Sequence, residues 1–450
     1  MANQADLSIT NGRVVTANGI EHVDLSVADG RIAALSRPGE VRARATIDAA
    51  GRLVLPGIVD SHVHVRDPGQ MEKEDFTSCS EAAAAGGVTT IMCQPNTDPV
   101  LDCADAFHAT AAAGRARSVV DFALQALASD RNLRDIPALQ ELGVVSFEIF
   151  VGGVPGPLAT ESREGQLNVF RAIAAAGGIA GLYPGESETV EVLSKDGAGD
   201  PADVLRANPR LLEAGALLPA AALAADAGCP IHVRQMSSEI ACLCVEWIRH
   251  NLAGGRLSAE VTPHHLVLTE DDFEQHGASG YIMPPLRKAS DVDALWRGVT
   301  SGAVDTVGTD HSPHTAREKE QGGSDLSKAL PGFPGLETFL PAVFSEFLRR
   351  DLTAADFVKL SAENPARLFG LYPRKGAIAV GADADIIIVD DETRWHVDPG
   401  RFRSKARYSP FAGREVRARA DVTMVRGSAV WADGDVVAEP GHGVLLTPGR

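Results

Sequence analysis

The sequence of 450 residues lacks several features that mark other classes of protein. It contains no run of about 18 apolar residues, so we expect no membrane-spanning helix. Residues 1–6 have neither a basic start nor an apolar core, so we expect no signal peptide and a cytoplasmic protein. The six cysteines form no CxxC pair, which argues against a zinc knuckle and predicts reduced, mostly buried thiols.

Basic residues are in deficit, with 42 basic against 60 acidic side chains and a formal charge of −18. A surface of this sign disfavours nucleic acid and anionic membranes as partners. A small anionic substrate can still bind where local cations outweigh the overall field. Apolar residues make up 44% and charged residues 23%, which is typical of a soluble globular protein.

The two ends of the chain resemble one another in pattern. Short apolar runs separated by Asn-Gly and Asp-Gly turn signals predict strands near the N-terminus. Similar runs near the C-terminus predict further strands. The expected strands are residues 7–9, 13–15, 31–35, 377–380, 385–389, 422–425 and 429–431. We predict one small β-sandwich domain built from residues 1–55 and 373–450.

The middle of the chain alternates β-branched runs with Ala- and Leu-rich helical stretches. The pairs begin with a strand at 88–92 and a helix at 104–115, and end with a strand at 306–308 and a helix at 335–349. This rhythm and length predict a (β/α)8 barrel over residues 56–372. A doubly wound open sheet is the alternative, but no glycine-rich phosphate turn follows the first strand.

The segment VDSHVHVRDPG at residues 59–69 carries the sharpest local signal. Residues two apart on a strand share a face, so His62 and His64 point to one spot, where imidazoles suit a divalent metal ion. Two unrelated strand histidines explain a bare HxH equally well. In the segment GTDHSPHT at residues 308–315, Asp310 can ligate a metal and accept a proton from water, although a helix N-cap aspartate is the common alternative.

Several further motifs occur in an order that carries a family resemblance. They are KED at 73–75, GGVTT at 86–90, QPNTDPV at 94–100, TPHHL at 262–266, PPLR at 284–287, NPARLFGL at 364–371 and GADADIIIVD at 381–390. With the two histidine-rich segments, they resemble dihydroorotase, a cyclic amidohydrolase related to hydantoinase and allantoinase. The resemblance spans most of the chain.

The resemblance implies hydrolysis of a ring amide by water activated on a metal ion, most simply zinc. His62, His64 and Asp310 match the family's ligands, and Asp310 also its general base and acid. Arg66, Asn96 and His314 match the residues that hold a substrate carboxylate. Each has an ordinary alternative alone: a surface arginine, a turn asparagine and a helix-capping histidine. The resemblance also implies a homo-oligomer, a dimer or a tetramer.

One departure from the family concerns the strand that ends in a carbamylated lysine in dihydroorotases. Here Glu148 stands at the lysine's position within an apolar run. A glutamate offers the same type of ligand as a carbamate, and a buried carboxylate is costly unless a cation answers it. We therefore expect Glu148 to be a fourth metal ligand. The alternative is a salt bridge to Arg234, two strands along.

Two other ligand positions have changed. Pro184 and Gln235 stand where the family has metal-binding histidines, and Met283 replaces an asparagine before PPLR. His264 and His265 match a structural pair. These changes predict one metal ion per chain, which suffices for amide hydrolysis.

Three functions remain open from the sequence. The first is a dihydroorotase-type enzyme of pyrimidine metabolism that interconverts dihydroorotate and N-carbamoyl-aspartate. The second is a hydrolase of another cyclic amide or imide such as a hydantoin, because Met283 and Tyr183 can reshape the pocket. The third is a catalytically silent scaffold, suggested by the lost histidines. The intact group of His62, His64 and Asp310 favours an enzyme over the scaffold.

Overall fold

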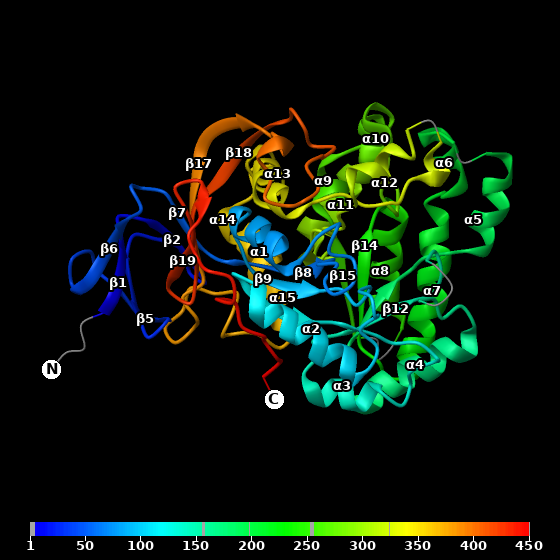
Figure 1. The fold of residues 1–450 in the computed structure, drawn as a ribbon, viewed down its shortest axis with the longest axis horizontal. Helices are drawn as coiled ribbons and strands as arrows, with labels where there is room; N and C mark the ends of the chain where they lie inside the picture. The colour runs from blue at the N-terminus through cyan, green and yellow to red at the C-terminus, as the bar shows by residue number, and fades with distance from the viewer. Residues whose placement is uncertain (1–4, 155–157, 198, 253–255, 324, 450) are drawn as a thin grey trace.

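The computed structural model describes residues 5–154, 158–197, 199–252, 256–323 and 325–449. Figure 1 shows a small all-β part that carries the blue N-terminal strands, beside a larger part in which strands are surrounded by helices. The orange and dark-red strands near the C-terminus also lie in the all-β part, so both ends of the chain contribute to it, and the last residues run back beside the barrel.

The all-β part is a sandwich of two sheets with strand orders β5-β4-β1-β6 and β20-β19-β18-β17-β7-β2-β3. Apolar side chains from both sheets and from nearby turns fill the space between them, among them Leu25, Val54 and Ile386. The strands are β1 (Ala5–Thr10), β2 (Arg13–Thr16), β3 (Gly19–Glu21), β4 (Asp24–Ala28), β5 (Arg31–Ser36), β6 (Ala43–Asp48), β7 (Leu53–Pro56), β17 (Ile386–His396), β18 (Glu415–Val425), β19 (Ser428–Ala432) and β20 (Asp435–Val436).

The larger part is a parallel (β/α)8 barrel. Its strands are β8 (Ile58–Val63), β9 (Val88–Cys93), β10 (Asp121–Leu124) with β11 (Ala126–Leu127), β12 (Phe147–Phe150), β13 (Ala180–Tyr183), β14 (Ile231–Met236), β15 (Leu257–Val261) and β16 (Thr306–Val307). Neighbouring strands pair in parallel, and Gln125 links β10 to β11. A parallel bridge between Val63 and His311 closes the barrel from β8 to the segment that follows β16.

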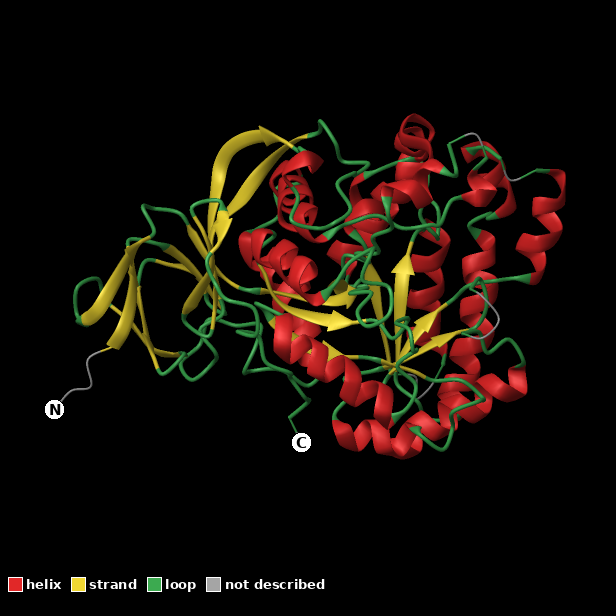
Figure 2. Ribbon diagram, viewed as in Figure 1, coloured by secondary structure: helices red, strands yellow, loops and turns green. Residues whose placement is uncertain are grey.

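Helices surround the barrel strands, as Figure 2 shows. In α4, Ser162 accepts a hydrogen bond from the first turn, Gly177 ends the helix in a left-handed conformation, and Val169 and Ile173 face the core. The helices are α1 (Phe76–Ala85), α2 (Ala104–Arg117), α3 (Ile136–Leu142), α4 (Arg163–Ala176), α5 (Glu188–Leu193), α6 (Pro201–Ala207), α7 (Leu211–Asp226), α8 (Glu239–Asn251), α9 (Pro263–Val267), α10 (Glu270–His276), α11 (Ala289–Ser301), α12 (Ala316–Glu320), α13 (Leu336–Arg349), α14 (Ala354–Val358) and α15 (Asn364–Leu368).

The barrel with a sandwich built from both ends of the chain confirms the predicted fold class. One expected strand is wrong, because residues 377–380 lie in a turn region. Ile378 is buried in the sandwich core and Val380 is 65% exposed, which reproduces strand-like alternation without strand pairing. Gly376 and Gly381 adopt positive φ angles of 82° and 91° on either side, which interrupts an extended backbone. Within the described residues, no helix combines the length and the apolar character needed to cross a membrane.

A buried ionic cluster joins the barrel to the C-terminal segment. The Nζ atom of Lys375, which is fully buried, lies 2.6 Å from Asp121 of β10 and 2.6 Å from Asp385, just before β17. A third carboxylate, that of Asp383, lies 3.0 Å away. Arg426, which follows β18, also pairs with Asp121. Removing one partner of such a buried cluster leaves an uncompensated charge, so the cluster ties the two parts together.

We predict that Lys375→Met lowers the free energy of unfolding by about 3–5 kcal/mol, because it leaves three buried carboxylates close together. Urea denaturation monitored by circular dichroism measures this change. The matched control is Arg394→Met, since Arg394 is 64% exposed in its ion pair with Glu415 and should contribute less than about 1 kcal/mol. Equal effects of the two substitutions would contradict the stabilising role of Lys375.

Candidate active site

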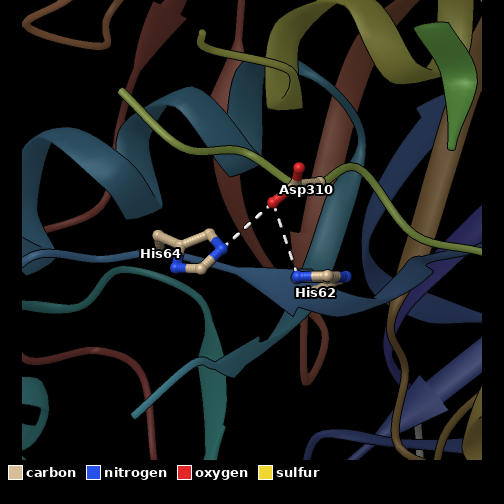
Figure 3. A group of neighbouring side chains, drawn as sticks. All are labelled: His62, His64 and Asp310. Atoms are coloured by element: carbon tan, nitrogen blue, oxygen red, sulfur yellow. Dashed lines mark hydrogen bonds and ion pairs between the residues drawn. The ribbon is translucent and has the colours of Figure 1, made fainter. Parts of the chain in front are cut away.

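The candidate site lies where the barrel strands end. His62 lies on β8 and His64 just beyond it, so both rings project on the same side. Asp310 follows β16. Figure 3 shows that these three side chains point toward one another, and their candidate ligand atoms all lie within 4.8 Å. The structure therefore brings the predicted HxH pair and the predicted aspartate into one group.

The hydrogen bonds of the two histidines determine which ring nitrogen faces the centre. His62 Nδ1 donates to Glu260 Oε1 over 2.7 Å, and His64 Nδ1 donates to Asn96 Oδ1 over 2.7 Å. Both Nε2 atoms are then directed at Asp310 Oδ1, at 3.4 Å from His62 and 3.0 Å from His64. Nδ1 atoms bound to a carboxylate or amide oxygen are the usual arrangement for histidines that bind metal through Nε2.

This arrangement fits a divalent metal ion. Burial lowers the pKa of His64, so its ring is neutral and its Nε2 presents a lone pair to a carboxylate oxygen. Two lone pairs that face each other repel unless a cation lies between them. Burial also opposes protonation of His62, but Glu260 and Asp310 raise its pKa, so this point of the site favours positive charge. Two imidazole nitrogens and a carboxylate oxygen are typical ligands of zinc.

Gln235, which the sequence placed at a lost ligand position, holds the carboxylate of Asp310. Its side-chain nitrogen donates a short hydrogen bond to Asp310 Oδ2, which leaves Oδ1 to the two histidines. Burial would raise the pKa of Asp310, but His62 and His64 outweigh burial and keep it below its ordinary value. Gln235 and Asp310 both adopt positive φ angles, 52° and 48°, as strained residues at functional sites often do.

Glu148 does not join the three ligands. Its carboxylate takes two hydrogen bonds from Arg234, at 2.7 and 3.1 Å, and one from Ser146 at 2.8 Å. Arg234 also donates to Glu260 Oε2 over 2.9 Å. Instead of the expected metal–ligand bond, the structure thus shows the salt bridge that was the alternative. We leave Glu148 out of the ligand set, since its acceptor oxygens already face a guanidinium.

The expected carboxylate-binding residues lie around the same centre. Arg66 is only 6% exposed, its Nε has no hydrogen-bond partner, and no carboxylate of the described chain lies within ion-pair distance of it. Its charge contributes to the lowered pKa of His64, after burial. Asn96 uses Oδ1 for His64, so its amide nitrogen is left to donate to a ligand.

His314 is a neutral ring in this arrangement. Burial, reinforced by Arg66 and neighbouring lysines, lowers its pKa to about 3. Its Nε2 donates to the carbonyl oxygen of Pro331 over 3.0 Å. Its buried Nδ1 has no hydrogen-bond partner among the described residues, and Oε2 of Glu318 lies 3.7 Å from it. Nδ1 is thus an acceptor, which suits a ring N–H better than a carboxylate. The hydroxyl of Tyr408, from the C-terminal segment before β18, accepts a hydrogen bond from the His314 backbone at 3.2 Å.

Sequence reasoning missed Glu260 and Tyr408. No motif marks them, because each reaches the site from a strand or segment distant in sequence. Two glycines also gained meaning only from the structure: a Cβ on Gly181 would clash with the Glu148 carboxylate, and one on Gly308 would clash with Glu260. His264 and His265 were expected to have structural roles. The ring of His265 is hydrogen-bonded to the hydroxyl of Thr262 and to the carbonyl oxygen of Pro284.

Comparison with known proteins identifies the family. The model of the amidohydrolase family matches residues 187–430, more than half of the chain, and a dihydro-orotase-like model matches residues 51–151. The chain belongs to the amidohydrolase family. It is similar to L-hydantoinase of Paenarthrobacter aurescens, with 36% identity over 98% of both proteins, and to dihydroorotase of Methanosarcina mazei, with 32% identity over 98% of this chain and 97% of that protein.

The likeness extends to solved structures. L-hydantoinase (dihydropyrimidinase) from Arthrobacter aurescens superposes with a TM-score of 0.95 at 35% identity, covering 99% of this chain and all of that one. The relatives include proteins named hydantoinase and dihydroorotase, and this amidohydrolase is accordingly an enzyme. The relatives include both hydantoinase and dihydroorotase, so membership alone leaves the substrate open.

We predict that Gln235→Met weakens binding of a divalent metal ion by about 10–100-fold, because Asp310 loses the donor that orients it. Competition with a metallochromic chelator measures the affinity. Gln166→Met is the matched control. Gln166 is also buried, but its side chain donates to the backbone carbonyl oxygens of Thr160 and Glu161, just before α4, and not to a metal ligand. An unchanged affinity in Gln235→Met would show that Asp310 does not depend on Gln235.

Proposed function

We propose that this amidohydrolase opens a cyclic amide that carries a carboxylate, with dihydroorotate and N-carbamoyl-aspartate as the interconverted pair. The proposal includes one divalent metal ion, zinc, held by His62, His64 and Asp310. The observation that carries it is the buried side chain of Arg66 beside these ligands, whose Nε has no hydrogen-bond partner and which forms no ion pair with a carboxylate of the described residues. A buried cation without a hydrogen-bonded anion is costly, so a substrate carboxylate is the natural partner.

The side chains have separate tasks in this reaction. Hydrolysis adds water across the C–N bond: the oxygen joins the carbonyl carbon, and the ring nitrogen leaves with a proton. When bound, zinc lowers the pKa of water to about 7 and polarises the carbonyl group. Asp310 accepts the proton of the attacking water and returns it to the leaving nitrogen. Gln235 keeps its carboxylate directed at the centre.

The carboxylate-binding residues would hold the ring in place. Arg66 offers a charged donor and Asn96 an amide donor, which together suit a carboxylate. Nδ1 of His314, which has no hydrogen-bond partner among the described residues, would accept from a ring N–H. A substrate bound through these groups would have its amide carbon near Asp310. The atoms of His62, His64 and Asp310 that bind the metal ion would stay free of contacts with the substrate carboxylate.

A hydantoin is the second candidate substrate, favoured by two observations. The similarity to L-hydantoinase covers almost the full chain. A small cavity of about 40 Å³ at the end of β13 has apolar walls from Met283, Leu212 and Pro284, and is also lined by Glu213 and Arg287. Its apolar walls suit an uncharged ring substituent. The homo-oligomer expected from the sequence stays a prediction.

Steady-state kinetics of Arg66→Met with two substrates tests the proposal. We expect KM for dihydroorotate to rise by about 10–100-fold, because a charged hydrogen bond contributes about 1.5–3 kcal/mol. KM for an uncharged 5-alkyl hydantoin should not change. Methionine keeps the length of the stem, and Arg171→Met, at a surface ion pair with Asp226, is the matched control.

The outcomes separate the candidates. Activity of the zinc-loaded wild type on the hydantoin alone would replace the first substrate class by the second. Turnover of dihydroorotate with an unchanged KM in Arg66→Met would remove Arg66 from substrate binding. Asp310→Asn gives the inactive reference, and zinc-loaded protein that opens neither ring would contradict both candidates.

A further inference from the structure

A buried arginine lies inside the barrel below the candidate metal site. Arg234 projects from β14 and is 1% exposed. Its Nε and Nη2 atoms bond to Glu148 of β12, and its Nη1 atom bonds to Glu260 of β15 and to the carbonyl oxygen of Ser61. Its guanidinium also lies 5.6 Å from the ring of Phe369. These partners hold it in one position.

Glu260 connects this arginine to the metal site. One of its oxygens accepts from Arg234, and the other accepts from Nδ1 of His62. The same carboxylate accepts a hydrogen bond from Ser61 Oγ at 2.8 Å. A continuous chain of contacts therefore runs from Glu148 through Arg234 and Glu260 to His62, entirely within the barrel.

Glu148 and Glu260 both face the guanidinium of Arg234, Glu148 at Nε and Nη2 and Glu260 at Nη1. The guanidinium therefore lies between the two carboxylates and takes the position that a cation bound by both of them would need. Asp310 lies on the other side of His62, with its Oδ1 3.4 Å from Nε2 of that ring.

We propose that Arg234 is a fixed cation of the centre, which occupies the place between Glu148 and Glu260 and thereby limits the site to one metal ion. This inference rests on the proposed metal site at His62, His64 and Asp310. Without the guanidinium, two carboxylates would face each other inside the barrel. His232, whose Nε2 lies 3.6 Å from Glu260 Oε2, would add an imidazole. Two carboxylates and an imidazole are a suitable ligand set for a divalent ion.

The test is the metal content of Arg234→Ala in the full-length protein. Wild type and variant are stripped with a chelator, reloaded with excess zinc, freed of unbound zinc by gel filtration and measured by elemental analysis. We expect one zinc per chain in the wild type and two in Arg234→Ala. In the double variant Arg234→Ala/Glu148→Gln the content should return to one, because the new site loses a carboxylate.

Arg234→Gln provides a second variant, which is uncharged and shorter but retains hydrogen-bonding groups, and it should also bind two zinc ions. One zinc per chain in both folded single variants would overturn the role of Arg234 while leaving the proposed function intact. Failure of both variants to fold even with zinc present would also overturn it, because a divalent ion should replace the guanidinium charge. A wild type that binds no zinc would contradict the proposed metal site itself.

The matched control is Arg249→Ala. Arg249 also pairs with an aspartate, Asp305, but lies 27% exposed at the opposite end of the barrel strands. Its removal should leave one zinc per chain. A second zinc in this control would show that the gain does not depend on the pair of Glu148 and Glu260.

Discussion

The carboxylate of Glu260 is the contact on which the arrangement of the site depends. It is fully buried, and it is stable there because His62, Ser61 and Arg234 all donate to it. By accepting from Nδ1 of His62, it leaves Nε2 free to face Asp310. Glu260 also accepts from Arg234, so the positive charge of Arg234 is shared between two carboxylates, those of Glu260 and Glu148. Glu260 therefore both orients the metal ligand His62 and fixes the cation Arg234 inside the barrel.

The remaining parts of the site depend on this interior. Glu148, Arg234 and Glu260 lie on barrel strands, so the strands fix their positions. Gly181 and Gly308 leave the space that the two buried carboxylates fill. Across the sandwich interface, Lys375 plays a similar part by joining three carboxylates from the barrel and the C-terminal segment. In both places a single buried cation holds together segments that are distant in the sequence.

The features that could be predicted from the sequence are those that depend on short-range periodicity or on the order of motifs along the chain. The alternation of strands and helices predicted the barrel, and the two-residue spacing of His62 and His64 predicted that their rings meet. The motif around Asp310 placed it at the end of a strand. Each of these depends on short-range periodicity or on motif order, which a single sequence displays directly.

The features that it could not predict depend on contacts across the barrel. Whether Glu148 binds a metal ion or an arginine depends on the position of Arg234, two strands away, and the sequence left both possibilities open. The bond from Gln235 to Asp310 depends on backbone angles at both residues. The expected strand at residues 377–380 had the right alternation, but alternation does not show whether a pairing partner is present.

Anomalous diffraction at the zinc absorption edge, from crystals grown with zinc, is the direct test of a single metal ion in this barrel. We expect one peak, about 2.0–2.2 Å from Nε2 of His62, Nε2 of His64 and a carboxylate oxygen of Asp310. The guanidinium of Arg234 should lie between Glu148 and Glu260 with no peak beside it. A peak between those two glutamates, or none at the two histidines, would rule out a single-ion site limited by Arg234.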